Sequence, residues 1–221
     1  MVLVSDLQVS TLPKRESEEM AISLQKGQKI DLTKGNAGLK NLMVGLGWDP
    51  VQQKSGGLLG GLFGGGGGSN VDCDASVMML DENDRLLDKK SVIYFGNLTS
   101  KCGSVKHTGD NLTGDGDGDD EQVLIDLSKV PSNVHKIVFV VNIYQAVQRK
   151  QHFGMIQNAF IRVVDSATKT ELVHYNLSDD YSGLTSLIPG EIYRHGGEWK
   201  FAAVGSGTKD ASITEIANRH S

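Results

Sequence analysis

The sequence predicts an all-β protein, an antiparallel β-sandwich of about ten strands with a short C-terminal helix. Apolar residues alternate with polar ones over many short stretches, which is typical of strands with one buried face. Turn-forming Gly, Asn, Asp and Pro residues separate these stretches at fairly regular intervals. A clear helical pattern is found at the C-terminus. Ser212, with Glu215 three residues later, forms a capping box, and Ile213, Ile216 and Ala217 form the apolar face of a short helix.

Along the chain, residues 1–19 are expected to be a poorly ordered extension, and residues 20–221 to form one β-sandwich domain. Residues 22–32 alternate weakly around Gly27 and predict a short hairpin. A strand over 42–48 ends at Asp49-Pro50. Residues 136–144 are almost continuously apolar, which predicts a central strand covered on both faces. Further strands are expected over 77–80, 91–95, 122–127, 158–164, 171–177, 191–194 and 199–204, the last two joined by a hairpin turn.

Composition and charge exclude several classes of protein. The net charge of −5 and a pI near 5.7, without a basic patch, argue against a nucleic-acid partner. No apolar run is long enough to span a membrane. Cys73 and Cys102 are too few for a disulfide framework. The first 19 residues lack the apolar core of a secretion signal, so a cytoplasmic protein is expected.

Residues 55–69 are mostly glycine and predict a loop, because glycine loses the most conformational entropy on ordering. Leu58, Leu59, Leu62 and Phe63 interrupt the glycines. Two interpretations of residues 58–63 stay open: contact with a partner or a membrane surface, or packing back onto the protein. A phosphate-binding loop is rejected, since no strand–loop–helix context or Lys-Ser/Thr pair follows.

The most acidic stretch is residues 109–121, with six carboxylates and no lysine or arginine. Because the net charge of the whole chain is −5, the remainder is nearly neutral. Crowded carboxylates repel one another, and a bound cation relieves that repulsion. Oxygen ligands separated by glycines suit Ca²⁺, whereas the alternative is a flexible, solvated loop. An EF-hand begun at Asp115 fails, because Asp120 replaces the required Gly and Asp126 the final Glu.

A second acidic site precedes the strand at 77–80. Asp72 and Asp74 are two residues apart, so in an extended chain both side chains point to the same side. The alternative is that they flank a turn. Since a β-sandwich gathers its loops at two ends, this pair and the acidic stretch can meet at one of them.

Several motifs resemble those of one family. They are Val-Gly-Leu-Gly-Trp-Asp at 44–49, Asp-Cys-Asp-Ala-Ser at 72–76, His-Thr-Gly-Asp-Asn-Leu-Thr-Gly at 107–114, Gly-Asp-Asp-Glu at 118–121, Asn-Ala-Phe-Ile-Arg-Val-Val at 158–164, and Ile-Tyr-Arg-His at 192–195 with Glu-Trp-Lys-Phe at 198–201. From Met20 nearly to the C-terminus the chain resembles the TerD family of bacterial tellurium-resistance and general-stress proteins.

The resemblance implies a β-sandwich that binds Ca²⁺ through the two acidic segments and has no established catalytic activity. Carried over residue by residue, the candidate metal ligands are Asp72, Asp74, Asp110, Asn111, Asp115, Asp117, Asp119, Asp120 and Glu121. The expected function is that of a cytoplasmic, non-enzymatic, calcium-binding stress-response protein, with calcium ions and protein partners of a stress-response complex as its partners.

Two other functions stay open. One is a Ca²⁺-dependent docking module for a protein partner, a membrane surface or a small anionic ligand, with residues 58–63 as a contact. The other is a metal-dependent hydrolase, because clustered aspartates can hold a divalent ion against a phosphate group. The hydrolase needs a base, for which His107 is the nearest residue in sequence, and no nucleophile is recognisable.

Overall fold

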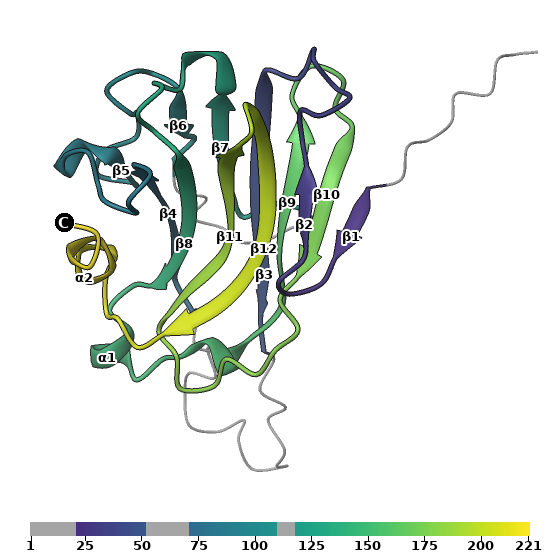
Figure 1. Cartoon of the computed structure of the whole chain (residues 1–221). Helices are drawn as coiled ribbons and strands as arrows, with labels where there is room; N and C mark the ends of the chain where they lie inside the picture. Colours follow the sequence, from purple (N-terminus) through teal and green to yellow (C-terminus); the bar gives the residue numbers. More distant parts are fainter. Residues whose placement is uncertain (1–20, 52–70, 110–117) are drawn as a thin grey trace, which may run out of the picture.

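The computed structural model describes residues 21–51, 71–109 and 118–221, which form two packed β-sheets (Figure 1). Sheet A has the strand order β1-β10-β9-β3-β7-β6, and sheet B the order β2-β12-β11-β8-β4-β5. The strands are β1 (Ile22–Leu24), β2 (Lys29–Asp31), β3 (Asn41–Pro50), β4 (Cys73–Leu80), β5 (Val92–Ile93), β6 (Val105–His107), β7 (Glu121–Asp126), β8 (Lys136–Ile143), β9 (Ile156–Asp165), β10 (Glu171–Asn176), β11 (Ser186–His195) and β12 (Glu198–Thr208). Apart from the parallel β1–β10 pair the strands are antiparallel, so the predicted sandwich is confirmed.

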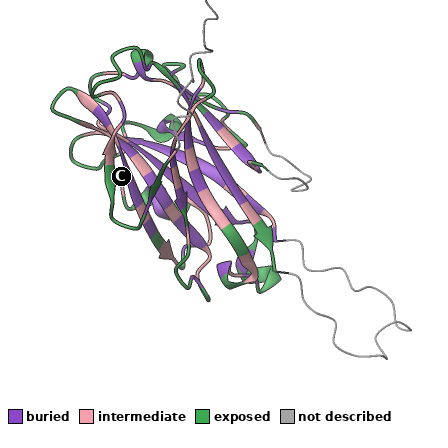
Figure 2. Ribbon diagram, turned by 90° about the vertical axis from the view of Figure 1, so that its right-hand side faces the viewer, coloured by how far each residue is buried: buried purple, intermediate pink, exposed green. Residues whose placement is uncertain are grey.

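The core lies between the two sheets, and Figure 2 shows buried residues along the strands of both. Leu42 and Leu46 of β3 meet Phe139 of β8 and Phe201 of β12 in this layer, all at most 1 % exposed. The expected extension over 1–19 and the glycine-rich loop over 55–69, including residues 58–63, lie outside the described residues. Among the residues that are described, no helix is both long and apolar enough to cross a membrane.

Strand β8 is covered on both faces, as its almost continuous apolar sequence predicts. Phe139 faces the main core between the sheets. Val138 and Val140 face a second, smaller cluster with Ile216 and Ala217 of helix α2 (Ile213–Asn218). The C-terminal helix therefore buries the outer face of sheet B, and its predicted position is confirmed.

The hairpin predicted for residues 22–32 is wrong. Strand β1 pairs with β10 in sheet A, while β2 pairs with β12 in sheet B, so this segment crosses from one sheet to the other. Gly27 has a left-handed backbone with φ of 82°, and its N–H donates to the carbonyl of Ala203. Alternation of apolar residues shows that a segment is extended but does not identify the strand with which it pairs.

Several strand boundaries differ from the sequence prediction, since β4, β11 and β12 are all longer than expected. Within residues 91–95 only Val92–Ile93 is a strand, because a short 3₁₀ turn (Lys89–Ser91), capped by Asp88, precedes it. Strand β6 (Val105–His107) was not predicted, since three residues carry too little alternation to be recognised. This short strand matters for the site, because it carries His107 to the start of β7.

Candidate functional site

The structure describes five of the nine predicted ligands. Asp110, Asn111, Asp115 and Asp117 lie outside the described residues. Asp119, Asp120 and Glu121 run into the start of β7, and Asp72 and Asp74 lie at the start of β4. The five carboxylates therefore belong to one strand of each sheet, and their hydrogen bonds show which of them meet.

Glu121 joins the two acidic segments. Its Oε2 accepts a hydrogen bond of 2.6 Å from the backbone N–H of Ala75, the residue directly after Asp74. The Glu121 side chain is only 3 % exposed, and His107 Nε2 lies 3.1 Å from the same oxygen. A side chain of sheet A thus binds the backbone of sheet B, which brings the acidic stretch and the Asp72–Asp74 pair to the same edge of the sandwich.

Cys73 lies between Asp72 and Asp74, and the pKa of its thiol depends on the carboxylates around it. The pKa of its buried thiol is raised well above 9.0, first because burial disfavours the thiolate. The negative charges of Asp74, Asp72, Glu121 and Asp120 raise it further, in that order. Four of the predicted ligands therefore lie close enough to one buried atom to act on it together.

Asp120 is held by backbone groups of β3. Its Oδ2 accepts a 2.7 Å hydrogen bond from the N–H of Trp48, and its own N–H donates to the carbonyl of Leu46. The pKa of the Asp120 carboxyl is raised above 3.8, chiefly by burial, against the opposing effect of the Trp48 hydrogen bond. Repulsion from Asp49, Glu121 and Asp119 raises the pKa further. The folded chain therefore carries an unfavourable negative charge at this position.

This raised pKa predicts that Asp120→Asn stabilises the protein when divalent cations are absent. Between the unfolded pKa near 3.8 and the higher folded pKa, the folded state binds more protons, so wild-type stability falls as the pH rises through this window. Asparagine keeps an oxygen for the Trp48 N–H and removes the charge. In EDTA, urea unfolding from pH 3 to 7 should show a variant advantage that grows with pH. An advantage that does not change with pH would count against the repulsion.

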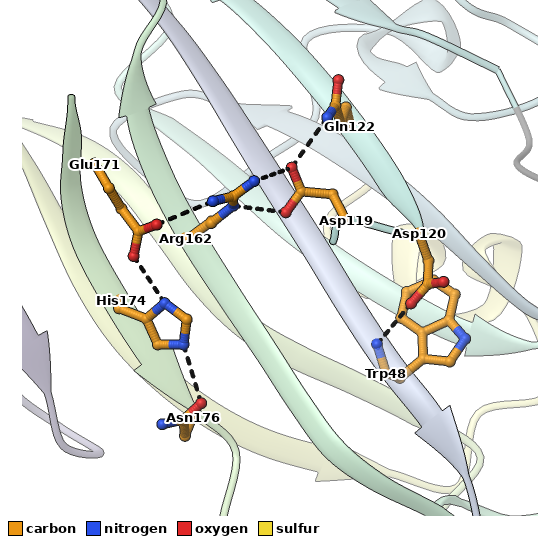
Figure 3. A network of polar contacts seen from close by, with 8 residues as sticks. All are labelled: Trp48, Asp119, Asp120, Gln122, Arg162, Glu171, His174 and Asn176. Atoms are coloured by element: carbon orange, nitrogen blue, oxygen red, sulfur yellow. Dashed lines mark hydrogen bonds and ion pairs between the residues drawn. The ribbon is translucent and has the colours of Figure 1, made fainter. Parts of the chain in front are cut away.

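Asp119 has a different environment, an ion pair on the outer face of sheet A (Figure 3). Arg162 of β9 donates from Nε and Nη2 to its two oxygens, at 2.7 and 2.9 Å, and Gln122 Nε2 donates at 3.0 Å. The Asp119 side chain is fully buried, at 0 % exposure. Both of its oxygens are thus hydrogen-bonded to a guanidinium group, which neutralises its charge.

Gly45 of β3 makes room for this pair. In the register of sheet A it lies between Gln122 of β7 and Arg162 of β9. A Cβ atom at Gly45 would be 2.1 Å from Asp119 Oδ1, so the carboxylate occupies the space of the absent side chain. The glycine therefore allows residue 119 to lie directly on the strand, which fixes the end of the acidic stretch.

The ion pair continues across the sheet to β10. Arg162 Nη1 donates to Glu171 at 3.0 Å, Glu171 lies 2.8 Å from His174 Nδ1, and His174 Nε2 lies 3.1 Å from Asn176 Oδ1. The His174 ring also stacks on Phe160, with ring centroids 5.1 Å apart. The acidic stretch is thereby connected to β9 and β10 through side chains alone.

Asp72 forms a partly exposed ion pair with Arg149. Arg149 Nη1 approaches Asp72 Oδ2 to 3.3 Å, and the two side chains are 37 % and 45 % exposed. The carbonyl of Asp72 accepts the N–H of Tyr144, and Asp74 pairs with Asn142 in the register of β4 and β8. These two residues are therefore fixed by the backbone of sheet B.

A cleft of about 460 Å³ lies beside the acidic stretch. Trp48, Asp49, Gly118, Asn158 and Phe160 form much of its lining. Within the described residues, no group of three or more His, Cys, Asp or Glu side chains is arranged to hold a metal ion. The described carboxylates are thus neighbours without forming a complete coordination shell by themselves.

Sequence reasoning did not predict which side chains and backbone groups bind these carboxylates, and it considered His107 only as a possible base. Arg162, His107 and the Trp48 N–H each bind a different one, and Arg162 and Trp48 come from distant parts of the chain. A signal was present at Gly45 and Gly47, because two outward-facing glycines in one strand indicate that another group approaches closely. Gly47 indeed makes room for the Phe160 ring, which a Cβ atom would approach to 2.3 Å.

Comparison with known proteins identifies the family. The family model of the TerD domain matches residues 20–220. Stress response protein SCP2 of Bacillus subtilis is 67 % identical over 201 residues, covering 91 % of this chain and 100 % of that protein. Tellurium resistance protein TerD of Serratia marcescens is 46 % identical over 188 residues, covering 85 % and 91 % of the two chains.

A solved structure supports the fold. The crystal structure of a homologue of telluride resistance protein (TerD) from Streptomyces coelicolor has a TM-score of 0.60. It covers 83 % of this chain and 98 % of its own at 20 % identity, so it bears on the architecture alone. The two six-stranded sheets and the sequence matches agree with the resemblance of the motifs, and the chain belongs to the TerD family of tellurium-resistance and general-stress proteins.

Proposed function

We propose that this protein is a non-enzymatic, calcium-binding member of its stress-protein family, and that Ca²⁺ binds at the sandwich edge where the two acidic segments meet. The observation that carries the proposal is the hydrogen bond between Glu121 Oε2 and Ala75 N–H. It brings the end of the acidic stretch next to Asp74, although the two lie in different sheets. A hard divalent ion needs several oxygen ligands from such separate segments.

The chemistry of the described groups fits Ca²⁺. Asp120 and Glu121 offer carboxylate oxygens at buried positions, where they accept hydrogen bonds from the backbone N–H groups of Trp48 and Ala75 and from His107. The raised pKa of Asp120 shows that its charge is unfavourable without a cation. We expect Asp120, Glu121 and Asp74 to hold the ion together with ligands from residues 110–117. Asp119 would anchor the segment through Arg162.

Bound calcium would supply positive charge and link the segments. Since it binds the folded chain, the unfolding free energy should rise by RT ln(1 + [Ca²⁺]/Kd), about 2.7 kcal/mol at a hundredfold excess over Kd. Ca²⁺ should be preferred to Mg²⁺, because Mg²⁺ requires near-ideal octahedral geometry and loses water reluctantly.

Calorimetric titration of the full chain tests the proposal. We expect heat with Ca²⁺, a weaker response to Mg²⁺, and at least a tenfold loss of Ca²⁺ affinity in Asp120→Asn, about 1.4 kcal/mol. The matched control is Glu82→Gln, because Glu82 is an exposed carboxylate in a turn outside the site. No heat with Ca²⁺, or equal loss in both variants, would refute the proposal.

A docking function and a hydrolase function both stay predictions. The apolar residues 58–63 lie outside the described residues. His107 is 1 % exposed, and both of its ring nitrogens are within hydrogen-bond distance of protein groups, Glu121 and the N–H of Gly109. These contacts favour a structural role for His107 over that of a base.

A further inference from the structure

We infer that His107 is a positioning residue for the cation site, and that its Nε2–H holds the Glu121 carboxyl group in place. This inference rests on the proposed calcium binding and names a residue outside the predicted ligand set.

The hydrogen bonds of His107 identify its tautomer. The backbone N–H of Gly109 donates to Nδ1 at 3.0 Å, so Nδ1 presents a lone pair and carries no proton. The proton of the neutral ring is therefore on Nε2, which lies 3.1 Å from Glu121 Oε2 and donates to it. At 1 % exposure, the ring is shielded from water that could compete for either nitrogen.

Glu121 thus receives two neutral donors on one oxygen. The Ala75 N–H comes from sheet B at 2.6 Å, and His107 Nε2–H comes from β6 of sheet A. Neutral donors stabilise a carboxylate and fix its orientation without cancelling its charge. The His107 ring and the Ala75 N–H therefore fix the position of the Glu121 side chain at the meeting point of the two sheets.

Asp119 shows what a charged donor does two residues earlier. Arg162 binds both oxygens of Asp119 and neutralises it. Asp119 thus anchors the chain through an ion pair, whereas Glu121 is positioned by neutral donors. Outer-shell groups that orient a carboxylate ligand typically change metal affinity by about 10- to 100-fold when removed.

Substitutions at His107 separate positioning from simple packing. His107→Leu removes the Nε2–H donor, whereas His107→Gln keeps an N–H donor with a similar reach. We expect calorimetric Ca²⁺ titration to give a Kd about tenfold higher for His107→Leu and within about threefold of wild type for His107→Gln. His195→Gln, at the exposed last residue of β11, is the matched control and should not change Kd.

The tautomer is measured without any metal. Long-range ¹H–¹⁵N NMR of the calcium-free wild-type chain should show His107 with an unprotonated Nδ1 and a protonated Nε2, a signal that disappears in His107→Gln. A protonated Nδ1, or an imidazolium ring at neutral pH, would overturn the inference.

The outcomes distinguish this inference from the function on which it rests. Absence of Ca²⁺ binding by the wild-type chain refutes the proposed function and the inference together. Normal Ca²⁺ affinity in His107→Leu refutes the inference alone. If His107→Leu does not fold, the Ca²⁺ affinity of His107→Gln and the tautomer of the wild-type ring test the inference instead. A folded His107→Gln variant that binds Ca²⁺ tenfold more weakly counts against the donor role. A His107→Gln variant that binds Ca²⁺ normally supports it.

Discussion

Replacing Arg162 with methionine is expected to lower the free energy of unfolding by about 3 kcal/mol, because it leaves the buried Asp119 carboxylate without its charged partner. The Asp119 side chain is 0 % exposed, so water cannot replace the guanidinium. Methionine matches much of the aliphatic length of arginine, which limits the loss of packing. Urea unfolding of wild type and variant measures the difference.

Two variants show whether the buried pair accounts for that loss. Arg162→Lys keeps the positive charge but not the two parallel hydrogen bonds, so an intermediate loss is expected. Arg149→Met removes a more exposed ion pair with Asp72, and its loss should stay below about 1 kcal/mol. Equal losses in Arg162→Met and Arg149→Met would show that Asp119 does not depend on Arg162.

The fold was predictable for strands whose own pattern of apolar and polar residues shows which of their faces are buried. Residues 136–143 are apolar on both faces because the core between the two sheets lies on one side of β8 and helix α2 on the other. The crossing of residues 22–32 between sheets was not predictable in this way. Its partners, β10 and β12, are chosen by packing with segments far along the chain, which leaves no periodic signal in the segment itself.

The region of the candidate site was predictable, but the different roles of its individual carboxylates were not. The density of carboxylates identifies residues 109–121 as a candidate for binding a hard cation. Asp119, Asp120 and Glu121 look equivalent in sequence. Their neighbours make them different, since Asp119 meets a guanidinium while Asp120 meets a backbone N–H. Such distinctions depend on which side chains meet after folding.

Gly45 is the position at which one added carbon should disturb this arrangement most. The Cβ of an alanine would lie 2.1–2.4 Å from three atoms of the Asp119 carboxyl group. Asp119 cannot retreat easily, because its backbone is fixed by the following residue, whose N–H donates to Leu46 on the same strand β3. The carboxylate would have to leave Arg162, and the buried ion pair would break.

Gly45→Ala is therefore expected to cost about 2–3 kcal/mol of unfolding free energy in urea denaturation, as overpacking of a well-filled site does. Gly38→Ala is the matched control, because a Cβ there meets nothing closer than Asn36 Oδ1 at 4.0 Å, and it should change stability little. In an Asp119→Ala background the clash is absent, so Gly45→Ala should then cost much less, and the two changes should be strongly non-additive. Additive losses would mean that Gly45 is required for some reason other than the room it leaves for Asp119.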